Sequence, residues 1–210
     1  MGTAESVVSV PVMFGGPSPV KLAATVLFHL PSAAKMRGAE PFDAFHTSIV
    51  LGDVEYAFSG QGIRATRPYV SHSMLKRQTE VRMMGHTNFS AHQMVQFLTQ
   101  FFQPGTYDLL CKNCNSFSDC ALYLLLGQRL EAKYSRMERT GKVGQKRIGL
   151  MSALRLIGMN YQANPASQNF QVDEVLAKTD LCMRGRGVRP AQHYRLVEIE
   201  DAPRCCLACC

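Results

Sequence analysis

The chain has 210 residues, of which 46% are hydrophobic and 19% charged, a composition that supports a buried core and excludes a wholly disordered chain. Lys and Arg number 23 against 16 Asp and Glu, and residues 128–210 carry 14 of the basic and 8 of the acidic side chains. The surplus positive charge therefore lies in the last 83 residues, and since no zinc-finger or RRM-type pattern is present in the sequence, we expect no nucleic-acid partner.

The first part of the chain has the patterns of an antiparallel sheet. Two short apolar runs, 46–51 and 54–58, are separated by Gly52-Asp53, which predicts a β-hairpin. Other β-branched or alternating runs predict further strands, with an extended lead-in before them and a polar loop among them. These strands are expected at residues 20–28, 63–67 and 79–84, the lead-in at 1–19 and the loop at 31–42.

Two helices are predicted next. Ser90 and Gln93 form a capping-box pattern, and apolar residues follow them at helical spacing. A second helix is expected to begin after Asn113-Cys114-Asn115, with Ser116 and Asp119 able to cap it and Gly127 as its end.

Beyond residue 128 the composition becomes polar and basic. Short helices are predicted at 148–157 and 172–178, with a linker-like stretch at 160–171 and an irregular one at 184–190. These shifts in composition predict four parts of the chain. They are a lead-in at 1–19, a folded domain at 20–135, a basic extension at 136–204 and a cysteine-rich tail at 205–210.

The eight cysteines are grouped in a few stretches of the chain, whereas a secreted disulfide framework would spread them through the fold. The sequence also has no signal-peptide pattern, and its longer apolar runs, such as 22–30, are too short to span a bilayer. We therefore expect a cytoplasmic protein with free thiols.

Cys114 is the candidate nucleophile. It lies at the entry of a predicted helix, where unpaired backbone N–H groups and the positive end of the helix dipole favour an anion. A thiolate is expected to be stabilised there, and Asn113 and Asn115 surround it with polar groups. The alternative is an ordinary half-buried thiol, because free cysteines are commonly buried.

His46 is the best-placed candidate for a base, because it begins an apolar strand that could fix the imidazole. A lone histidine on a strand can equally be structural. His29, at a strand end, is a weaker candidate. The remaining histidines lie in loop or surface-like contexts: His72, His86, His92 and His193.

Two motifs surround the candidate residues. The first is Phe45-His46-Thr47-Ser48-Ile49-Val50 followed by Glu55-Tyr56-Ala57-Phe58 and Gly60-Gln61-Gly62-Ile63. The second is Gly105-Thr106-Tyr107-Asp108-Leu109-Leu110, then Asn113-Cys114-Asn115-Ser116-Phe117-Ser118, then Leu125-Leu126-Gly127. Together they resemble the PPPDE family of permuted papain-fold peptidases, which includes the desumoylating isopeptidases. The likeness covers about residues 20–130. The chain departs from the family in having no proline turn after Gly127.

The resemblance implies an α+β, permuted papain-like cysteine hydrolase fold, in which a small antiparallel-rich sheet packs with helices and 20–135 is the hydrolase domain. Cys114 would be the nucleophile and His46 the base of a dyad that removes ubiquitin or SUMO from conjugates, and the backbone N–H of Cys114 could hold the oxyanion. The alternatives are an S-acyl protein thioesterase with the same dyad and a non-catalytic, lipid-anchored membrane adaptor. No third catalytic residue is assigned, no cofactor is implied, and a homodimer is possible.

Cys111 and Cys114 also form a C-x-x-C pair, which could be redox-active or half of a zinc site. A zinc site needs a second pair of ligands, and no spacing in the sequence supplies one. We therefore expect no metal, and we expect Cys111 to be a packed thiol.

Both ends of the sequence suggest lipid attachment. The first six residues fit the myristoylation pattern at Gly2, and a second signal is needed because one myristoyl chain binds membranes only marginally. That signal could be palmitoylation or dicysteine-type prenylation in the tail, assisted by the basic extension. The tail cysteines are Cys205, Cys206, Cys209 and Cys210. The expected location is the cytosolic face of a membrane.

Overall fold

The computed structural model describes residues 16–30, 42–141, 150–152, 154–155 and 158–185. Five strands form one antiparallel sheet in the order β4-β3-β2-β1-β5. The strands are β1 (Ser18–Leu30), β2 (Phe42–Leu51), β3 (Val54–Ser59), β4 (Gly62–Thr66) and β5 (Thr79–Thr87). Each of the predicted strands is present, and the predicted hairpin is β2–β3.

The hairpin follows directly from its turn residues. Leu51 pairs with Val54 across the two-residue turn, and Gly52 adopts a φ of 61°, a left-handed conformation that glycine reaches without steric cost. The pairing of β2 with β3 extends only from Leu51 back to Ile49. The first half of β2 therefore pairs with β1 alone, and its other edge is available to another element.

The helices are α1 (Val70–Ser73), α2 (Ala91–Thr99), α3 (Cys114–Leu126), α4 (Arg136–Gly141) and α6 (Val172–Gly185), with a 3₁₀ turn at Pro165–Ser167. The capping box of Ser90 and Gln93 at the start of α2 is confirmed. Gly127 ends α3 in the left-handed conformation, as predicted. The cap of α3 differs from the prediction, because Asn113, and not Ser116, accepts the first backbone N–H groups of the helix.

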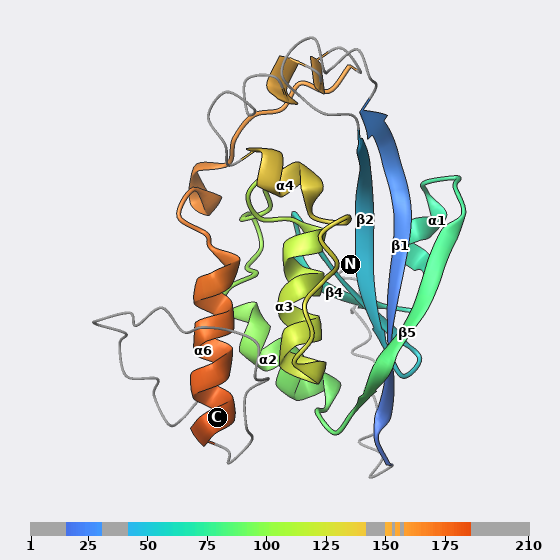
Figure 1. Ribbon diagram of the computed structural model, residues 1–210, viewed down its shortest axis with the longest axis vertical. Coiled ribbons are helices and arrows are strands. Elements are labelled where there is room, and N and C mark those ends of the chain that lie inside the picture. The colour runs from blue at the N-terminus through green and yellow to red at the C-terminus, as the bar shows by residue number, and fades with distance from the viewer. Residues whose placement is uncertain (1–15, 31–41, 142–149, 153, 156–157, 186–210) are drawn as a thin grey trace, which may run out of the picture.

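The sheet separates two unequal layers (Figure 1). Helix α3 packs against β2 and is flanked by α2 and α6, whereas the short α1 lies on the other side of the sheet. Large apolar side chains from both the sheet and the helices fill the space between them, among them Leu22, Ile49, Phe58, Phe102, Phe117 and Leu122. The fold class is the expected one, an α+β fold with an antiparallel sheet packed against helices.

The extension beyond residue 135 contributes to this core. Helix α6 is longer than the predicted 172–178, and its Val175 and Leu176 belong to the same hydrophobic cluster as α3. The hydroxyl of Tyr123 on α3 donates to the carboxylate of Asp180 on α6, at 2.7 Å. Part of the predicted helix at 148–157 lies outside the described residues; its Leu150 and Leu154 are buried in a second, smaller cluster. The predicted domain boundary at 135 stays a prediction.

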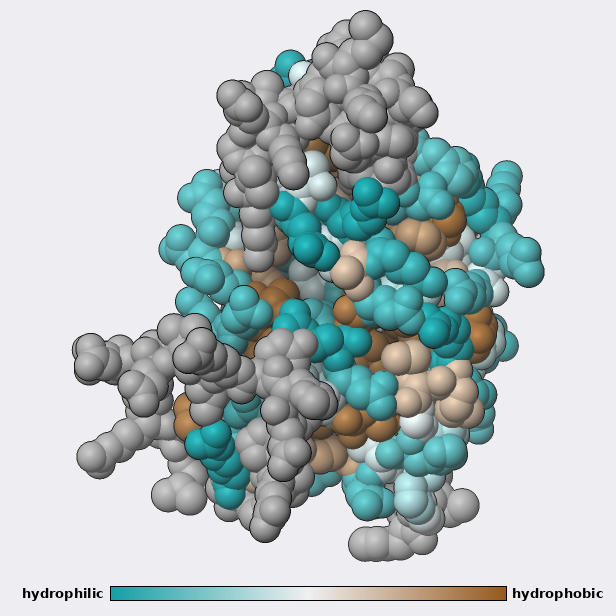
Figure 2. Space-filling view, viewed as in Figure 1, coloured by the Kyte–Doolittle hydropathy of each residue, from teal (hydrophilic) through white to brown (hydrophobic). Residues whose placement is uncertain are grey.

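The helical side of the molecule is mostly hydrophilic where described residues face the viewer (Figure 2), as expected of a layer that covers a sheet. Within the described part of the chain, no helix has both the length and the apolar character needed to cross a membrane.

Candidate active site

The first residues of α3 occupy the free edge of β2. The side-chain amide of Asn115 donates to the carbonyl of Phe45 at 3.1 Å, and the hydroxyl of Thr47 donates to Asn115 Oδ1 at 2.9 Å. Asn113 accepts from the N–H groups of Asn115 and Ser116. These bonds fix the helix N-terminus against the strand at the point where β3 no longer pairs with it.

Cys114 is the first residue of α3, and its thiol faces this strand edge. The residue is only 2% exposed. The thiol lies 3.9 Å from Asn115 Oδ1, and the backbone N–H of Thr47 and the hydroxyl of Tyr107 act on it by lowering its pKa. The candidate nucleophile is thus buried against β2 and the loop before α3.

The protonation state of the thiol differs from the expectation. Burial raises the pKa of Cys114 to about 11, and the nearby charge of Glu138 acts in the same direction. The N–H groups of Thr47 and Asn115 and the Tyr107 hydroxyl lower it, but they do not outweigh burial. The expected stabilised thiolate is therefore wrong for the resting protein, whose thiol is protonated at neutral pH.

His46 lies on β2, next in sequence to Thr47. Its Nε2 lies 2.7 Å from the hydroxyl oxygen of Ser71 on α1. Its ring contacts the ring of His72 in a tilted arrangement, with 4.6 Å between the two ring centroids. Burial lowers the pKa of His46 to about 4; His72 lowers it further, and the charge of Glu55 opposes both. The imidazole is therefore neutral at pH 7.

The structure places the two predicted catalytic residues close to the same part of β2, without a direct bond between them. His46 belongs to the strand, and Cys114 begins the helix that packs against it. Side chains alternate along a strand, so Thr47 points to α3 and His46 to α1. Among the described residues, His46 and Cys114 share no hydrogen bond. They are connected indirectly, because Asn115, the neighbour of Cys114, is bonded to Phe45 and Thr47, the neighbours of His46.

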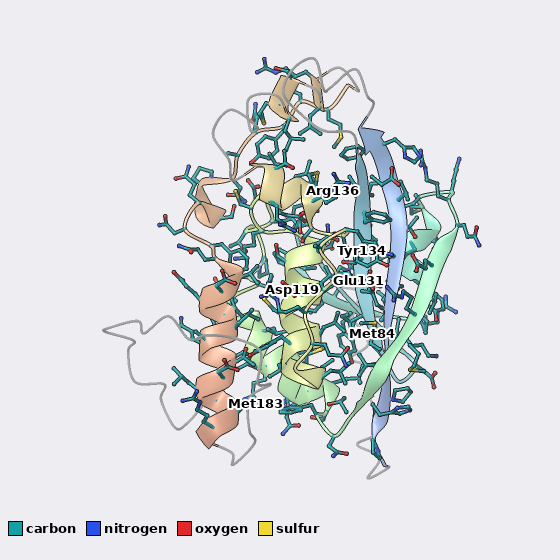
Figure 3. All side chains as sticks on the ribbon, in the orientation of Figure 1. Met84, Asp119, Glu131, Tyr134, Arg136 and Met183 are labelled. Carbon is teal, nitrogen blue, oxygen red and sulfur yellow. The ribbon has the colours of Figure 1, made fainter. Side chains whose placement is uncertain are left out.

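Glu138 reaches this site from a distant part of the sequence. After α3 the chain turns back along the helix, where the Asp119 carboxylate accepts hydrogen bonds from Arg129. It then passes Glu131 and Tyr134, and α4 begins at Arg136 (Figure 3). Glu138 Oε1 then accepts from the side-chain amides of the two asparagines that flank Cys114, at 2.5 and 2.8 Å. This carboxylate positions the helix entry and adds a negative charge near the thiol.

The loop before α3 is anchored by two charged groups. The Asp108 carboxylate accepts hydrogen bonds within the loop and from residues 161 and 164. The ammonium of Lys112 is buried, donates to Thr106 at 2.8 Å and lies 5.0–6.0 Å from three aromatic ring centres, those of Phe58, Phe102 and Phe170. Such contacts are favourable for a cation, and they fix the loop that carries Asn113 into α3.

The other histidines fall into two groups. The surface-like context predicted for His72 is wrong: the residue is buried, with Nδ1 2.8 Å from the Thr25 hydroxyl and Nε2 2.9 Å from that of Ser48. His29, the weaker candidate base, is exposed and lies beside Asp43 and Arg77. His86 and His92 are exposed, and His193 is outside the described residues.

The remaining candidate residues do not form a second site. Cys111 is a partly exposed thiol that forms no disulfide within the described residues, and in the described ranges no group of three His, Cys, Asp or Glu side chains could hold a metal ion. The lipidation candidates all lie outside the described residues: Gly2, Cys205, Cys206, Cys209 and Cys210.

Glu138→Gln is expected to increase the reactivity of Cys114. The amide keeps an oxygen that can accept from the two asparagines, but it removes the negative charge that raises the thiol pKa. A larger fraction of thiolate then reacts at a given pH. We expect iodoacetamide to alkylate Cys114 several-fold faster at pH 8, as followed by peptide mass spectrometry. Glu131→Gln, on the exposed segment after α3, is the matched control, and an unchanged rate in Glu138→Gln would contradict the prediction.

Comparisons with known proteins show the family of the chain. The chain is 27% identical over 138 residues to desumoylating isopeptidase 1 of Xenopus laevis, a match that covers 64% of this chain and 78% of that protein. The family model of the PPPDE putative peptidase domain matches residues 27–151, a stretch that includes His46, Thr47, Cys114 and Glu138. Since that stretch is more than half of the chain, the protein belongs to the PPPDE family of peptidases.

Proposed function

We propose that the protein is a thiol isopeptidase that removes ubiquitin-like modifiers, with SUMO the first candidate, Cys114 the nucleophile and His46 the general base. The observation that carries the proposal is the attachment of the start of α3 to β2 beside His46: Asn115, next to Cys114, is bonded to the Phe45 carbonyl and the Thr47 hydroxyl, the residues on either side of His46. The name of the Xenopus relative, a desumoylating isopeptidase, favours SUMO over ubiquitin as the modifier.

The reaction begins from a neutral pair, because the thiol is protonated and the imidazole uncharged. His46 takes the thiol proton as the sulfur attacks the isopeptide carbonyl. Because the two groups share no hydrogen bond in the resting protein, the Cys114 side chain turns toward the imidazole for this step. The N–H groups at the start of α3 stabilise the oxyanion. Protonated His46 then gives the proton to the leaving lysine amine, and water hydrolyses the thioester.

Cleavage of defined conjugates tests this function. The full chain is incubated with a SUMO-conjugated protein and, separately, with a ubiquitin-conjugated protein, and free modifier is measured by gel densitometry. We expect release that is lost in Cys114→Ser and in His46→Asn and retained in Cys111→Ser, which changes the other thiol of the same loop. Release that persists in Cys114→Ser would overturn the proposal, and release from the ubiquitin conjugate alone would overturn the choice of SUMO.

The alternatives predict other outcomes of the same series. A thioesterase would turn over an S-acyl peptide, in a Cys114-dependent way, without releasing SUMO. A non-catalytic adaptor would do neither, and its Cys114 would remain unmodified by a SUMO probe with a C-terminal electrophile. Labelling of Cys114 by that probe would support the isopeptidase.

We also propose that the protein is peripheral on the cytosolic face of a membrane, anchored through Gly2 and the four tail cysteines. The lipid chains and the basic extension would act together, because neither a single chain nor a few charges bind firmly alone. Membrane fractionation of Gly2→Ala and of the variant with all four cysteines replaced by serine tests this. Unchanged membrane association in both would overturn it. Sedimentation of the purified protein tests whether it forms a homodimer.

A further inference from the structure

A buried polar cluster lies on the face of the sheet opposite α3. At its centre is Glu55 on β3, whose side chain is fully buried. The hydroxyl of Ser71 donates to Glu55 Oε1 at 2.5 Å, and the backbone N–H of Ser71 lies 3.3 Å from Glu55 Oε2. The same Ser71 oxygen lies 2.7 Å from His46 Nε2. A continuous chain of hydrogen bonds therefore runs from a buried carboxylate to the imidazole.

The direction of these bonds fixes the proton on the His46 ring. A carboxylate only accepts hydrogen bonds, and a serine hydroxyl has one proton to give. Because Ser71 gives its proton to Glu55, its oxygen must accept from His46, so Nε2 carries the hydrogen of the neutral ring. Nδ1 is then the unprotonated nitrogen, and among the described residues it has no hydrogen-bond partner.

We propose that Ser71 and Glu55 are positioning residues for His46, which hold its Nε2–H tautomer and leave Nδ1 to take the proton of Cys114. The proposal rests on the thiol isopeptidase function proposed above. In the step it serves, the S–H bond of Cys114 breaks, the proton forms a bond with Nδ1, and the sulfur electron pair forms the bond to the substrate carbonyl carbon. The proton later leaves Nδ1 with the lysine amine.

The charges around His46 suit this role. Two titratable groups face its ring, His72 from α1 and Glu55 from β3. The nitrogens of His72 lie against the hydroxyls of Thr25 and Ser48, and its pKa is lowered by burial, so it adds no positive charge at pH 7. Glu55 therefore stabilises the imidazolium that forms when His46 takes the thiol proton, and Ser71 transmits this support through its hydroxyl.

Ser71→Ala removes the hydroxyl that connects His46 to Glu55 and leaves both of those residues unchanged. We expect kcat on the SUMO conjugate to fall about 10- to 100-fold, part of the 10²–10⁴ that a positioned general base contributes, with KM unchanged because Ser71 does not contact Cys114 or its loop. Ser71→Thr, which keeps a hydroxyl, should recover most of the rate. Ser73→Ala is the matched control in the same helix, since its hydroxyl donates only to the Val70 carbonyl, and it should leave kcat unchanged.

A spectroscopic readout separates positioning from a general loss of structure. In protein labelled with ¹⁵N-histidine, the ring nitrogens of His46, assigned with His46→Asn, should report a single Nε2–H tautomer in the wild type and a mixture in Ser71→Ala. Glu55→Gln keeps an acceptor for Ser71, so the tautomer should persist while kcat falls through the lost charge. An unchanged kcat or a single retained tautomer in Ser71→Ala would overturn the proposal. If the wild type cleaves no conjugate, the proposed function fails, whereas the tautomer measurement still decides the role of Ser71.

Discussion

Asp108→Ala is expected to lower the free energy of unfolding by about 3–5 kcal/mol, because several buried donors lose an ionised acceptor together. The carboxylate accepts from the N–H groups of Leu110, Cys111 and Asn164, each at 2.8 Å, and from the hydroxyl of Tyr161 at 2.9–3.0 Å. Burial alone would raise the pKa of Asp108, but these hydrogen bonds lower it below its usual value. Urea unfolding at pH 7 measures the loss.

The control for this substitution is Asp43→Ala on β2. Asp43 is partly exposed and its side chain is paired with the exposed His29, so its loss should change stability by no more than about 0.5 kcal/mol. Amide exchange adds a local test, since the N–H groups of Leu110 and Asn164 should lose protection in Asp108→Ala. A loss of stability below about 1 kcal/mol, or unchanged protection of both amides, would contradict this role of Asp108.

Residues of the extension after residue 135 also hold the candidate active site in place. Asp108 lies in the loop that leads to Cys114, whereas Tyr161 and Asn164 lie some 50 residues later, beyond the end of the family match at residue 151. The same dependence is visible at Glu138, which holds the two asparagines beside Cys114. Segments that the composition separates from the catalytic domain therefore help to shape its centre.

The elements that sequence patterns predicted correctly are those with local causes. Gly52-Asp53 sets the hairpin, Ser90 with Gln93 starts α2, and Gly127 ends α3, each through contacts within a few residues. The four-residue helix α1 has no such signal, because it is too short to show an apolar period. It was missed, and Ser71 and His72 were missed with it.

The partners of the candidate catalytic residues were beyond sequence reasoning for a related reason. Ser71 meets Glu55 across 16 residues and His46 across 25, and no local pattern encodes such pairings. One feature of the sequence did indicate a role for Glu55: it is an acidic residue inside an apolar strand, and such a residue needs hydrogen-bond partners if it is buried. Its burial could have been suspected, but its connection to His46 could not.

A stabilised Cys114 thiolate was expected because the helix N-terminus lowers the thiol pKa, but burial raises that pKa by more. A helix N-terminus stabilises an anion by about 0.3–1 kcal/mol in most settings, whereas complete burial can shift a pKa by several units in the opposite direction. The sequence shows that Cys114 begins a helix, but not that the thiol is covered by β2, Tyr107 and the residues around Glu138. The larger effect was the one that depends on tertiary packing.

The same burial predicts that the protein loses stability in mild acid. His46 has its pKa lowered from 6.5 to about 4 in the folded protein, so between these values the unfolded chain binds the proton more readily. The stabilisation from the neutral ring is present above pH 6.5 and is lost as the pH falls toward 4. Between pH 7.5 and 5.0 we expect His46 alone to cost about 2 kcal/mol, and His72, whose pKa is lowered by burial as well, acts in the same direction.

Urea unfolding at the two pH values, in the wild type and in His46→Gln, isolates this contribution. The glutamine can still donate to Ser71 but does not titrate, so the variant should lose about 2 kcal/mol less than the wild type over the same interval. His92→Gln, at an exposed position on α2, should keep the full pH dependence. Equal losses in wild type and His46→Gln would show that the imidazole is not held neutral by burial.

At alkaline pH, stability falls as the pH rises. The pKa of Cys114 is raised from 9.0 to about 11, so the stabilisation from its neutral thiol is complete below pH 9 and is lost as the pH rises toward 11. The neutral thiol and neutral imidazole therefore place the range of greatest stability between about pH 7 and 9, the range in which the proposed proton transfer from Cys114 to His46 would begin from two uncharged groups.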